Sequence, residues 1–323
     1  MITMRFSVII PLYNKAPYVG KALQSVLDQT FTDYELIVVD DGSMDGSARV
    51  AEEVLSKAAV DCQLIRQENA GVSAARNSGV ARSRGDYLCF LDADDWWDPS
   101  FLAEMSALID EYPEAGIYGT GYVIVNETKR KTRVAPLGLD PGFEKGYINY
   151  CRVYAKAMAM PLTSISVAMP RMVFDEMKGF PAGVKLGEDF LLWVRTALHY
   201  KVAFLNKPLA FYNQDVDARF RAVGRLHEPR AHMLWNLGFL EEEEKDNPDL
   251  KQLIDNLRTI NLLSYLLPAQ YREDARRELA KVDWTRQPEK TRKLYRKPIP
   301  YLKIRQWILS EGARVKQWIV RHR

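Results

Sequence analysis

The sequence predicts an α/β protein with a mostly parallel sheet flanked by helices, followed by a helical C-terminal extension. Three observations predict this: strand-like apolar runs alternate with helical stretches over roughly the first hundred residues, polar clusters follow each run, and strand-like runs cease after residue 216. Alternating strands and helices produce a parallel sheet with helices on both faces. We therefore expect two parts, residues 1–215 and residues 216–323.

Four apolar runs are expected to form the first strands. They cover residues 6–12, 34–39, 62–66 and 87–92. The last run is apolar at every position from Tyr87 to Leu91, which suits a strand buried on both faces of a parallel sheet. Helical stripes separate the runs, and they begin near Pro17, at Asp45 or Ser47, and at Ala74.

Three carboxylates, Asp92, Asp94 and Asp95, follow the fourth run. Side chains two residues apart on a strand point the same way, so Asp92 and Asp94 are expected to share a face. A divalent cation would relieve their mutual repulsion, and hard oxygen ligands suit Mg²⁺ or Mn²⁺. The alternative is that Asp94 or Asp95 caps the helix near Pro99, although Asp98 is better placed for that role.

Polar residues also follow the other three runs. These clusters are Tyr13-Asn14, Asp40-Asp41 and residues 69–73. In open parallel sheets, ligands bind beyond the carboxyl ends of the strands. Polar residues at four strand ends therefore predict one binding site at that edge of the sheet.

Several common kinds of site are excluded by the sequence. No G-x-G-x-x-G motif follows a strand, no G-x-x-x-x-G-K-[ST] loop is present, and no G-x-S-x-G serves a hydrolase. The four histidines show no metal-ligand spacing, so none is given a role. Three scattered cysteines form no disulfide framework and favour a reducing compartment. Without a signal-peptide or transmembrane pattern, the protein is expected in the cytoplasm.

The extension is expected to be helical and to end in a basic segment. Helical stripes run through residues 226–240 and 250–267, and the acidic run Glu241–Glu244 between them is expected to face solvent. From Trp284 to Arg323 the chain holds twelve Lys and Arg against two Glu, a net charge of +10 that leaves −7 for the rest. A basic segment on an acidic body indicates an anionic partner for that segment alone.

Apolar residues recur near helical spacing within the basic segment. They are Ile304, Trp307, Ile308, Val315, Trp318 and Ile319. Residues 295–323 therefore fit two structures equally well: a helix on the anionic inner surface of the cell membrane, or an ordinary helix packed on the domain. Nucleic acid is not expected as a partner, because no recognition module accompanies the charge.

Five motifs in this order resemble the family 2 glycosyltransferases, which have the Rossmann-like GT-A fold. The resemblance covers roughly residues 5–215. The motifs are residues 7–14, 25–30, 38–43, 69–77 and 92–95. It implies a metal-dependent, inverting enzyme that uses a nucleotide sugar, with a nucleotide-binding half at about residues 1–100 and an acceptor half at about residues 101–215. The acceptor implied is a glycan or a lipid-linked glycan, of the kind used in bacterial surface polysaccharide assembly.

The resemblance also implies roles for single residues. Asp41 would contact the base of a UDP-sugar, and Tyr13 would stack on it. Asp92 matches the first carboxylate of the family's D-x-D motif, near the ribose, and Asp94 matches the second, which binds Mn²⁺ or Mg²⁺. Arg76 would reach the phosphates or hold the aspartates in place; the alternative is a structural salt bridge. The positions expected to bind the nucleotide are thus Pro11, Tyr13, Asp41, Asn69, Arg76, Asp92 and Ala93.

A second acidic pair, Glu188-Asp189, opens a predicted amphipathic helix. Taken alone, two carboxylates at a helix start favour the helix dipole or cap the helix. The pair also looks like the family's second acidic motif, in which the aspartate is the general base. That role is carried to Asp189, with Glu188 as the runner-up or as an acceptor-positioning residue.

One departure from the family pattern lies after Tyr212, where no basic residue follows directly. Arg219 or Arg221 would have to replace it near the diphosphate. Two other functions stay open: a nucleotide-sugar-binding or scaffold subunit without catalysis, and a sugar nucleotidyltransferase. The second requires a Gly-rich loop with an Arg after the first strand, which residues 12–15 do not provide.

Overall fold

The computed structural model describes residues 4–126, 128–216 and 225–309. The chain divides into two compact units, Met1–Phe239 and Leu240–Arg323. The first unit extends past the boundary expected at residue 215, because residues 225–239 are hydrogen-bonded to it. Leu186 forms a parallel β-bridge with His232, and the Lys185 amide donates to the Ala231 carbonyl at 2.8 Å.

The first half of the sheet is parallel, as predicted. The strands β1, β2, β3 and β4 pair side by side in parallel, in the order β3-β2-β1-β4. Their bounds are Phe6–Leu12, Tyr34–Asp40, Asp61–Arg66 and Tyr87–Phe90. Because β4 ends at Phe90, the three aspartates lie in the turn before β5 (Trp96–Trp97). Strand alternation therefore does not orient Asp92 and Asp94, and that part of the prediction is wrong.

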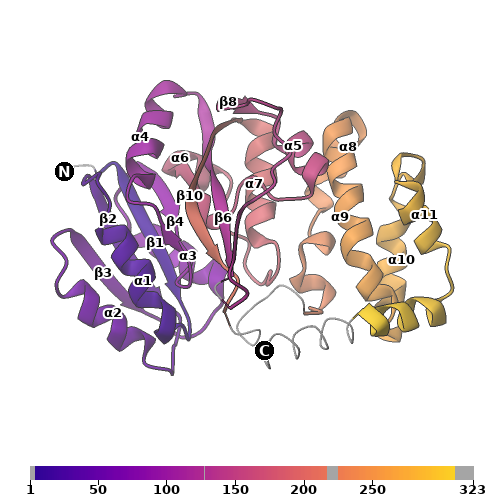
Figure 1. Cartoon of the computed structure of the whole chain (residues 1–323), viewed down its shortest axis with the longest axis horizontal. Coiled ribbons are helices and arrows are strands. Elements are labelled where there is room, and N and C mark those ends of the chain that lie inside the picture. Colours follow the sequence, from indigo (N-terminus) through magenta and orange to yellow (C-terminus); the bar gives the residue numbers. More distant parts are fainter. Residues whose placement is uncertain (1–3, 127, 217–224, 310–323) are drawn as a thin grey trace. The chain divides into compact units, whose positions relative to one another are not determined.

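The second half of the sheet is mixed. The strand β9 (Val167–Pro170) lies antiparallel between β4 and β6 (Ala115–Asn126), and β10 (Lys201–Asn213) runs parallel to β6. The strand β5 pairs with β10, and two short strands complete the ten-stranded sheet (Figure 1). These are β7 (Lys131–Val134) on β6 and β8 (Lys145–Ile148) on β10.

Helices cover both faces of the sheet, as the alternation predicted. Side chains of β1 alternate between the faces: Val8 and Ile10 join the core formed with α1, α2 and α4, whereas Ile9 approaches Gly79 of α3. Phe90 pairs with Ile9 across the strands and contacts rings of α6 and of the segment before α7. The helices are α1 (Ala16–Leu27), α2 (Ser47–Leu55), α3 (Val72–Arg82), α4 (Phe101–Glu111), α5 (Tyr150–Ala157), α6 (Arg171–Glu176) and α7 (Glu188–His199).

The last residues of the first unit differ from the prediction. Instead of one regular helix over residues 226–240, the described part of this stretch forms three short 3₁₀ helices. Pro229 and Gly238 account for the interruption, since neither residue favours a continuous helix. The 3₁₀ helices are Pro229–Ala231, Met233–Trp235 and Gly238–Leu240.

The second unit is helical, as predicted, and it is built around a buried arginine. Arg258 is 1% exposed and pairs with Glu244 at 2.9 Å, with Asp255 at 3.4 Å and with Glu278 at 3.4 Å. The expectation that residues 241–244 all face solvent is therefore wrong for Glu244. The helices are α8 (Glu243–Asp246), α9 (Pro248–Leu266), α10 (Arg272–Ala280) and α11 (Glu289–Tyr295), followed by helical residues 299–309. Within the described residues, no helix is both long and apolar enough to cross a bilayer.

Candidate active site

The loops at the carboxyl ends of β1 and β2 meet, as the strand order requires. The Asn14 amide donates to Ser43 Oγ at 3.0 Å, and the Lys15 amide donates to Ser47 Oγ at 2.7 Å. The Tyr13 ring is 42% exposed at this edge. Pro11 is buried within β1. The predicted polar edge of the sheet is therefore present, with an aromatic ring accessible on it.

Asp41 holds the loop that follows β3. Its carboxylate is buried and accepts three hydrogen bonds, from Gln67 Nε2 at 2.7 Å, the Ala70 amide at 2.9 Å and the Gly71 amide at 2.8 Å. Asn69 is exposed, and its Nδ2 donates to the Asp41 carbonyl at 2.9 Å. The sequence did not predict this organising role for Asp41. The Asp40 carboxylate stabilises the turn after β2, because it accepts from the Ser43 amide.

Arg76 joins the two acidic motifs. Its guanidinium lies 2.7 Å from Asp92 Oδ1 and 2.9 Å from Glu188 Oε1, and its side chain is 3% exposed. Burial opposes the charge, but Asp92 and Glu188 raise the pKa of Arg76 above its usual value. The contacts of Arg76 are ion pairs with carboxylates of both acidic motifs, which fit a structural salt bridge as well as a residue that holds the aspartates in place.

Asp94 faces a lysine that the sequence did not single out. Lys15 Nζ lies 2.6 Å from Asp94 Oδ2, and the two side chains are 13% and 17% exposed. The signal in the sequence that could have identified Lys15 was its position directly after the Tyr13-Asn14 cluster, at a strand end. Asp95 is buried and accepts from the Asn213 amide at 2.7 Å, which ties the aspartate turn to the end of β10. Burial, together with Asp94 and Asp92, raises the pKa of Asp95 well above its usual value.

The donor set at this turn fits a divalent cation that shares its ligands with a substrate. Among the described residues, no three or more His, Cys, Asp or Glu side chains are grouped to enclose a metal. The aspartate turn offers hard oxygen donors, which are the ligands that Mg²⁺ and Mn²⁺ prefer. A positive group, Lys15 Nζ, already lies at hydrogen-bonding distance from Asp94 Oδ2. Asp94 and Asp92 would therefore hold such an ion only with oxygens from a diphosphate or water.

Asp189 lies in the first turn of α7 beside Glu188. Its carboxylate accepts from the Phe190 amide at 2.7 Å, and the side chain is half-buried. Burial and the charge of Glu188 raise the pKa of Asp189 to about 7, and Arg76 opposes that shift. A carboxyl group with this pKa is well matched to general base catalysis near neutral pH.

Three tyrosines lie near Asp189. Burial, and the nearby charge of Asp189, raise the pKa values of Tyr122 in β6 and of Tyr150 and Tyr154 in α5, that of Tyr122 to about 12. The Tyr150 hydroxyl is buried and has no hydrogen-bond partner among the described residues. These aromatic residues lacked any motif and were not predicted. All three are buried, and they lie close enough to Asp189 for its charge to affect them.

Two further predictions about the site concern Ala93 and the arginines after Tyr212. Ala93 is 2% exposed, so its side chain offers almost no surface to a nucleotide. Arg219 and Arg221, considered as replacements for a basic residue after Tyr212, lie outside the described residues. Among the described residues, Lys15 supplies a cation at the aspartate turn instead.

The fold and this arrangement of carboxylates define a GT-A protein, and comparisons with known proteins agree. The model of glycosyl transferase family 2 matches residues 7–160. Glycosyltransferase GlyA of Streptococcus pneumoniae is 34% identical over 220 residues, which are 66% of this chain and 31% of GlyA. An uncharacterized glycosyltransferase of Nostoc sp. is 29% identical over 249 residues, 77% of this chain and 73% of the relative. The chain thus spans less than a third of GlyA.

Solved structures share the fold. Residues 1–349 of Staphylococcus aureus TarS, in complex with UDP-GlcNAc, align with a TM-score of 0.60 at 19% identity, covering 86% of this chain and 71% of TarS 1–349. The mannosyltransferase PcManGT of Pyrobaculum calidifontis, with GDP-Man and Mn²⁺, aligns with a TM-score of 0.56 at 21% identity, covering 91% and 79%. The match over residues 7–160 and the glycosyltransferase relatives support a family 2 glycosyltransferase, and they confirm the resemblance drawn from the motifs.

Proposed function

We propose that the protein transfers a sugar from a UDP-sugar to a hydroxyl group of a glycan or lipid-linked acceptor, with inversion at the anomeric carbon. The observation that carries this proposal is the bridge from Asp92 through Arg76 to Glu188. It brings the aspartate turn and the start of α7 to one site, although they are far apart in sequence. Asp189, with its pKa near 7, lies beside that bridge.

The nucleotide half would bind the uridine. The exposed Tyr13 ring would stack on uracil, and the oxygens of Asp92 would contact the ribose. An ionised carboxylate has about four lone-pair sites, and Asp41 uses three of them on its own loop. The remaining site would accept the uracil N3–H. Pro11, Asn69 and the backbone of Ala93 would complete the nucleotide contacts.

Asp94 and Asp92 would hold Mn²⁺ or Mg²⁺ together with the donor diphosphate. When bound, the ion neutralises the charge that develops on the leaving nucleoside diphosphate. Lys15 Nζ lies at hydrogen-bonding distance from Asp94 Oδ2. If Oδ2 binds the ion, the Lys15 ammonium would turn to the diphosphate. Arg76 is committed to Asp92 and Glu188, so we assign the diphosphate contact to Lys15.

The acceptor half would supply the base. Asp189 removes the proton of the acceptor hydroxyl while that oxygen attacks the anomeric carbon from the face opposite the diphosphate. The bond from carbon to acceptor oxygen forms as the bond to the phosphate oxygen breaks, and the proton stays on Asp189. A single displacement of this kind inverts the configuration, as in inverting glycosidases with an alcohol in place of water. Glu188 is paired with Arg76, so it acts as a positioning residue.

The setting that we propose is bacterial surface polysaccharide assembly at the cytoplasmic side of the cell membrane. The GlyA and Nostoc relatives come from bacteria and are named as glycosyltransferases. Lipid-linked glycans lie in the membrane, so an acceptor of this class fits a protein with a basic, Trp-containing C-terminal segment.

A donor panel tests the proposed function. The protein is incubated with UDP-glucose, UDP-galactose, UDP-GlcNAc and GDP-mannose, with and without Mn²⁺, and release of nucleoside diphosphate is measured. We expect turnover with one UDP-sugar that depends on the ion. Binding without turnover would indicate a non-catalytic subunit, and formation of a nucleotide sugar from a nucleoside triphosphate would indicate a nucleotidyltransferase.

The base is tested by Asp189→Asn. We expect this variant to bind UDP as the unmodified protein does and to lose transfer, because an amide cannot take the acceptor proton. Isothermal titration calorimetry measures the binding, and product analysis measures the transfer. Transfer at a near wild-type rate would remove Asp189 from the mechanism.

A further inference from the structure

The helical residues 299–309 of the second unit expose a row of large apolar side chains. Tyr301, Ile304 and Ile308 recur at spacings of three and four, which places them on one side of a helix. They are 47%, 59% and 56% exposed, and Trp307 next to them is 64% exposed. Leu302, in contrast, is 3% exposed. The helix therefore packs through one side and presents a second apolar side outward.

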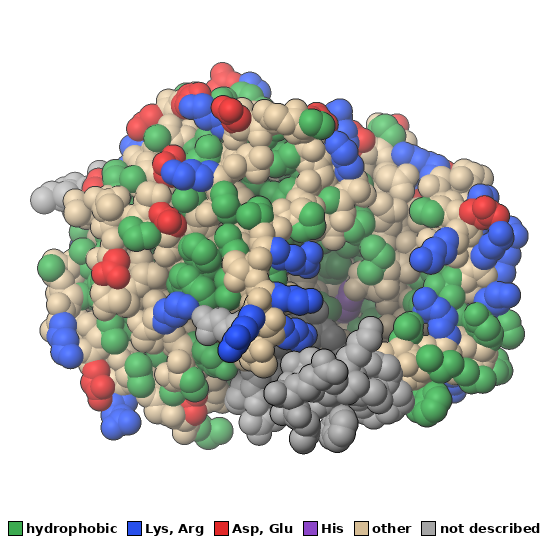
Figure 2. Space-filling model, viewed as in Figure 1, with side chains coloured by type: hydrophobic (Ala, Val, Ile, Leu, Met, Phe, Trp, Pro, Cys, Tyr) green, Lys and Arg blue, Asp and Glu red, His purple; other side chains and the backbone are tan. Residues whose placement is uncertain are grey.

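Basic residues accompany this row. Residues 284–309 contain eight Lys and Arg, and Glu289 is the single acidic residue among them. Lys303 is exposed within the row itself. Figure 2 shows Lys and Arg side chains beside hydrophobic ones on this unit. The apolar row thus lies in a positive field, which is unlike the acidic remainder of the chain.

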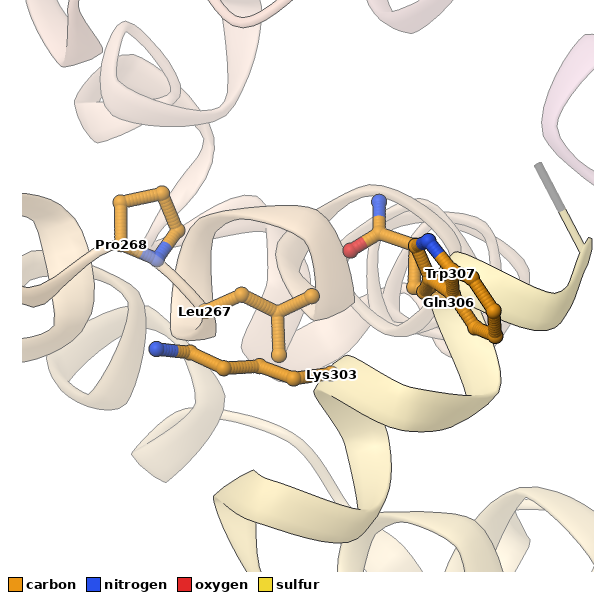
Figure 3. A pocket seen from close by; sticks show the side chains of 5 residues that line it. All are labelled: Leu267, Pro268, Lys303, Gln306 and Trp307. Atoms are coloured by element: carbon orange, nitrogen blue, oxygen red, sulfur yellow. The ribbon is translucent and has the colours of Figure 1, made fainter. Parts of the chain in front are cut away.

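A surface pocket adjoins the row and combines apolar and basic groups. Leu267 and Pro268, which follow α9, line one side, and Lys303, Gln306 and Trp307 line the other. The pocket has a volume of about 480 Å³. In Figure 3 the aliphatic part of Lys303 extends along Leu267, with the ammonium beyond it. An apolar pocket with one ammonium and one indole suits a phosphate group joined to a hydrocarbon.

We propose that this surface, Tyr301, Lys303, Ile304, Trp307 and Ile308 together with the pocket, binds the anionic surface of a lipid bilayer. Ile304, Trp307 and Ile308 enter the interface between headgroups and acyl chains, where Trp is favoured. Lys303 binds a lipid phosphate at the pocket, and the other basic residues are attracted by the negative surface.

Charge and shape favour a bilayer over other partners. Apolar insertion and electrostatic attraction together give stable membrane binding, whereas either one alone is weak. A nucleic acid would use the basic residues but has no use for Ile304 and Ile308. A second copy of the chain would bring the same positive charge to the interface, which opposes association at moderate salt. The proposal does not depend on the proposed sugar transfer.

Flotation of the full-length protein with vesicles tests the proposal. One vesicle preparation contains phosphatidylcholine alone, and the other also contains phosphatidylglycerol. The variants are the triple change I304S/W307S/I308S and the single change Lys303→Glu. The matched controls are Met44→Ser and Met172→Ser, because these methionines are 88% and 75% exposed in the first unit. All replaced side chains are exposed, and circular dichroism confirms that each variant folds.

We expect the unmodified protein and both controls to bind the vesicles with phosphatidylglycerol, and salt to weaken that binding. The triple change and Lys303→Glu are each expected to weaken it at least about tenfold. The proposal is overturned if the triple variant binds as well as the unmodified protein or if phosphatidylcholine vesicles bind equally well. It is also overturned if the unmodified protein binds no vesicles but is a dimer in solution that the triple change converts to a monomer.

Discussion

Replacing Arg76 with Gln is expected to change both the stability and the pH dependence of the enzyme. Arg76 is 2% exposed and pairs with Asp92 and Glu188. Gln keeps much of the volume but removes the charge, so the largely buried Glu188 and the partly exposed Asp92 both lose their partner. Removing one partner of a buried ion pair costs about 3–5 kcal/mol of stability. We expect a loss of that order, measured by urea unfolding.

The same change acts on the base. Arg76, together with the hydrogen bond from the Phe190 amide, opposes the upward shift of the Asp189 pKa, so loss of Arg76 is expected to raise that pKa above 7. A nearby opposite charge moves a carboxyl pKa by about 1–3 units, and we therefore expect a rise of roughly one unit or more. Asp189 works as a base only when ionised. The acid limb of kcat/KM against pH must consequently move to higher pH by the same amount.

Two controls make this prediction refutable. Arg82→Gln removes an exposed arginine from the same helix and is expected to change neither property. Glu188→Gln added to Arg76→Gln removes one orphaned carboxylate, so the double variant should regain part of the lost stability and shift the acid limb back. An acid limb that stays in place in folded Arg76→Gln would refute the electrostatic link between Arg76 and Asp189.

Three further predictions concern other parts of the chain. Lys15→Gln should weaken binding of UDP by about tenfold or more, because one charge-assisted hydrogen bond contributes about 1.5–3 kcal/mol. Binding of uridine should be unaffected. Calorimetry with both ligands measures this, and equal losses of affinity for both would contradict it. Asp41→Asn should destabilise the first unit by about 1–3 kcal/mol in urea, since an amide cannot accept from both the Ala70 and Gly71 amides. Arg258→Met should destabilise the second unit by about 3–5 kcal/mol, because it leaves three buried carboxylates without their common partner. An unchanged free energy of unfolding in urea would show that the cluster contributes nothing to stability.

The first half of the fold was predictable because its strands are continuous apolar runs that alternate with helices and pair in parallel. Polar residues at their ends could be assigned to one edge of the sheet for the same reason. The position of β9 between β4 and β6 was not predictable, since it depends on pairing between residues far apart in the chain. Nor does spacing reveal that Glu244 is buried, because its partner Arg258 lies on another helix.

At the site, residue types were predictable but their partners were not. Asp92, Asp94 and Asp189 stand out as grouped carboxylates next to strand or helix ends. The contact between Arg76 and Glu188, and the contact between Lys15 and Asp94, exist only after the sheet has folded. The tyrosines around Asp189 come from β6 and α5, two elements with no chemical motif of their own. Motifs therefore singled out the residues proposed as reacting groups, and the fold supplies their electrostatic environment.

The start of α7 sets a lower limit on the length of an active fragment. Gly187, directly before Glu188, adopts φ +80, and a Cβ there would collide with Met233. The Met233 amide donates to the Leu186 carbonyl at 3.0 Å, so residues 231–233 hold the backbone that positions the carboxylates. A protein cut after residue 215 retains every motif of the family yet lacks this support. The shortest fragment expected to keep Asp189 in place for catalysis ends at Phe239.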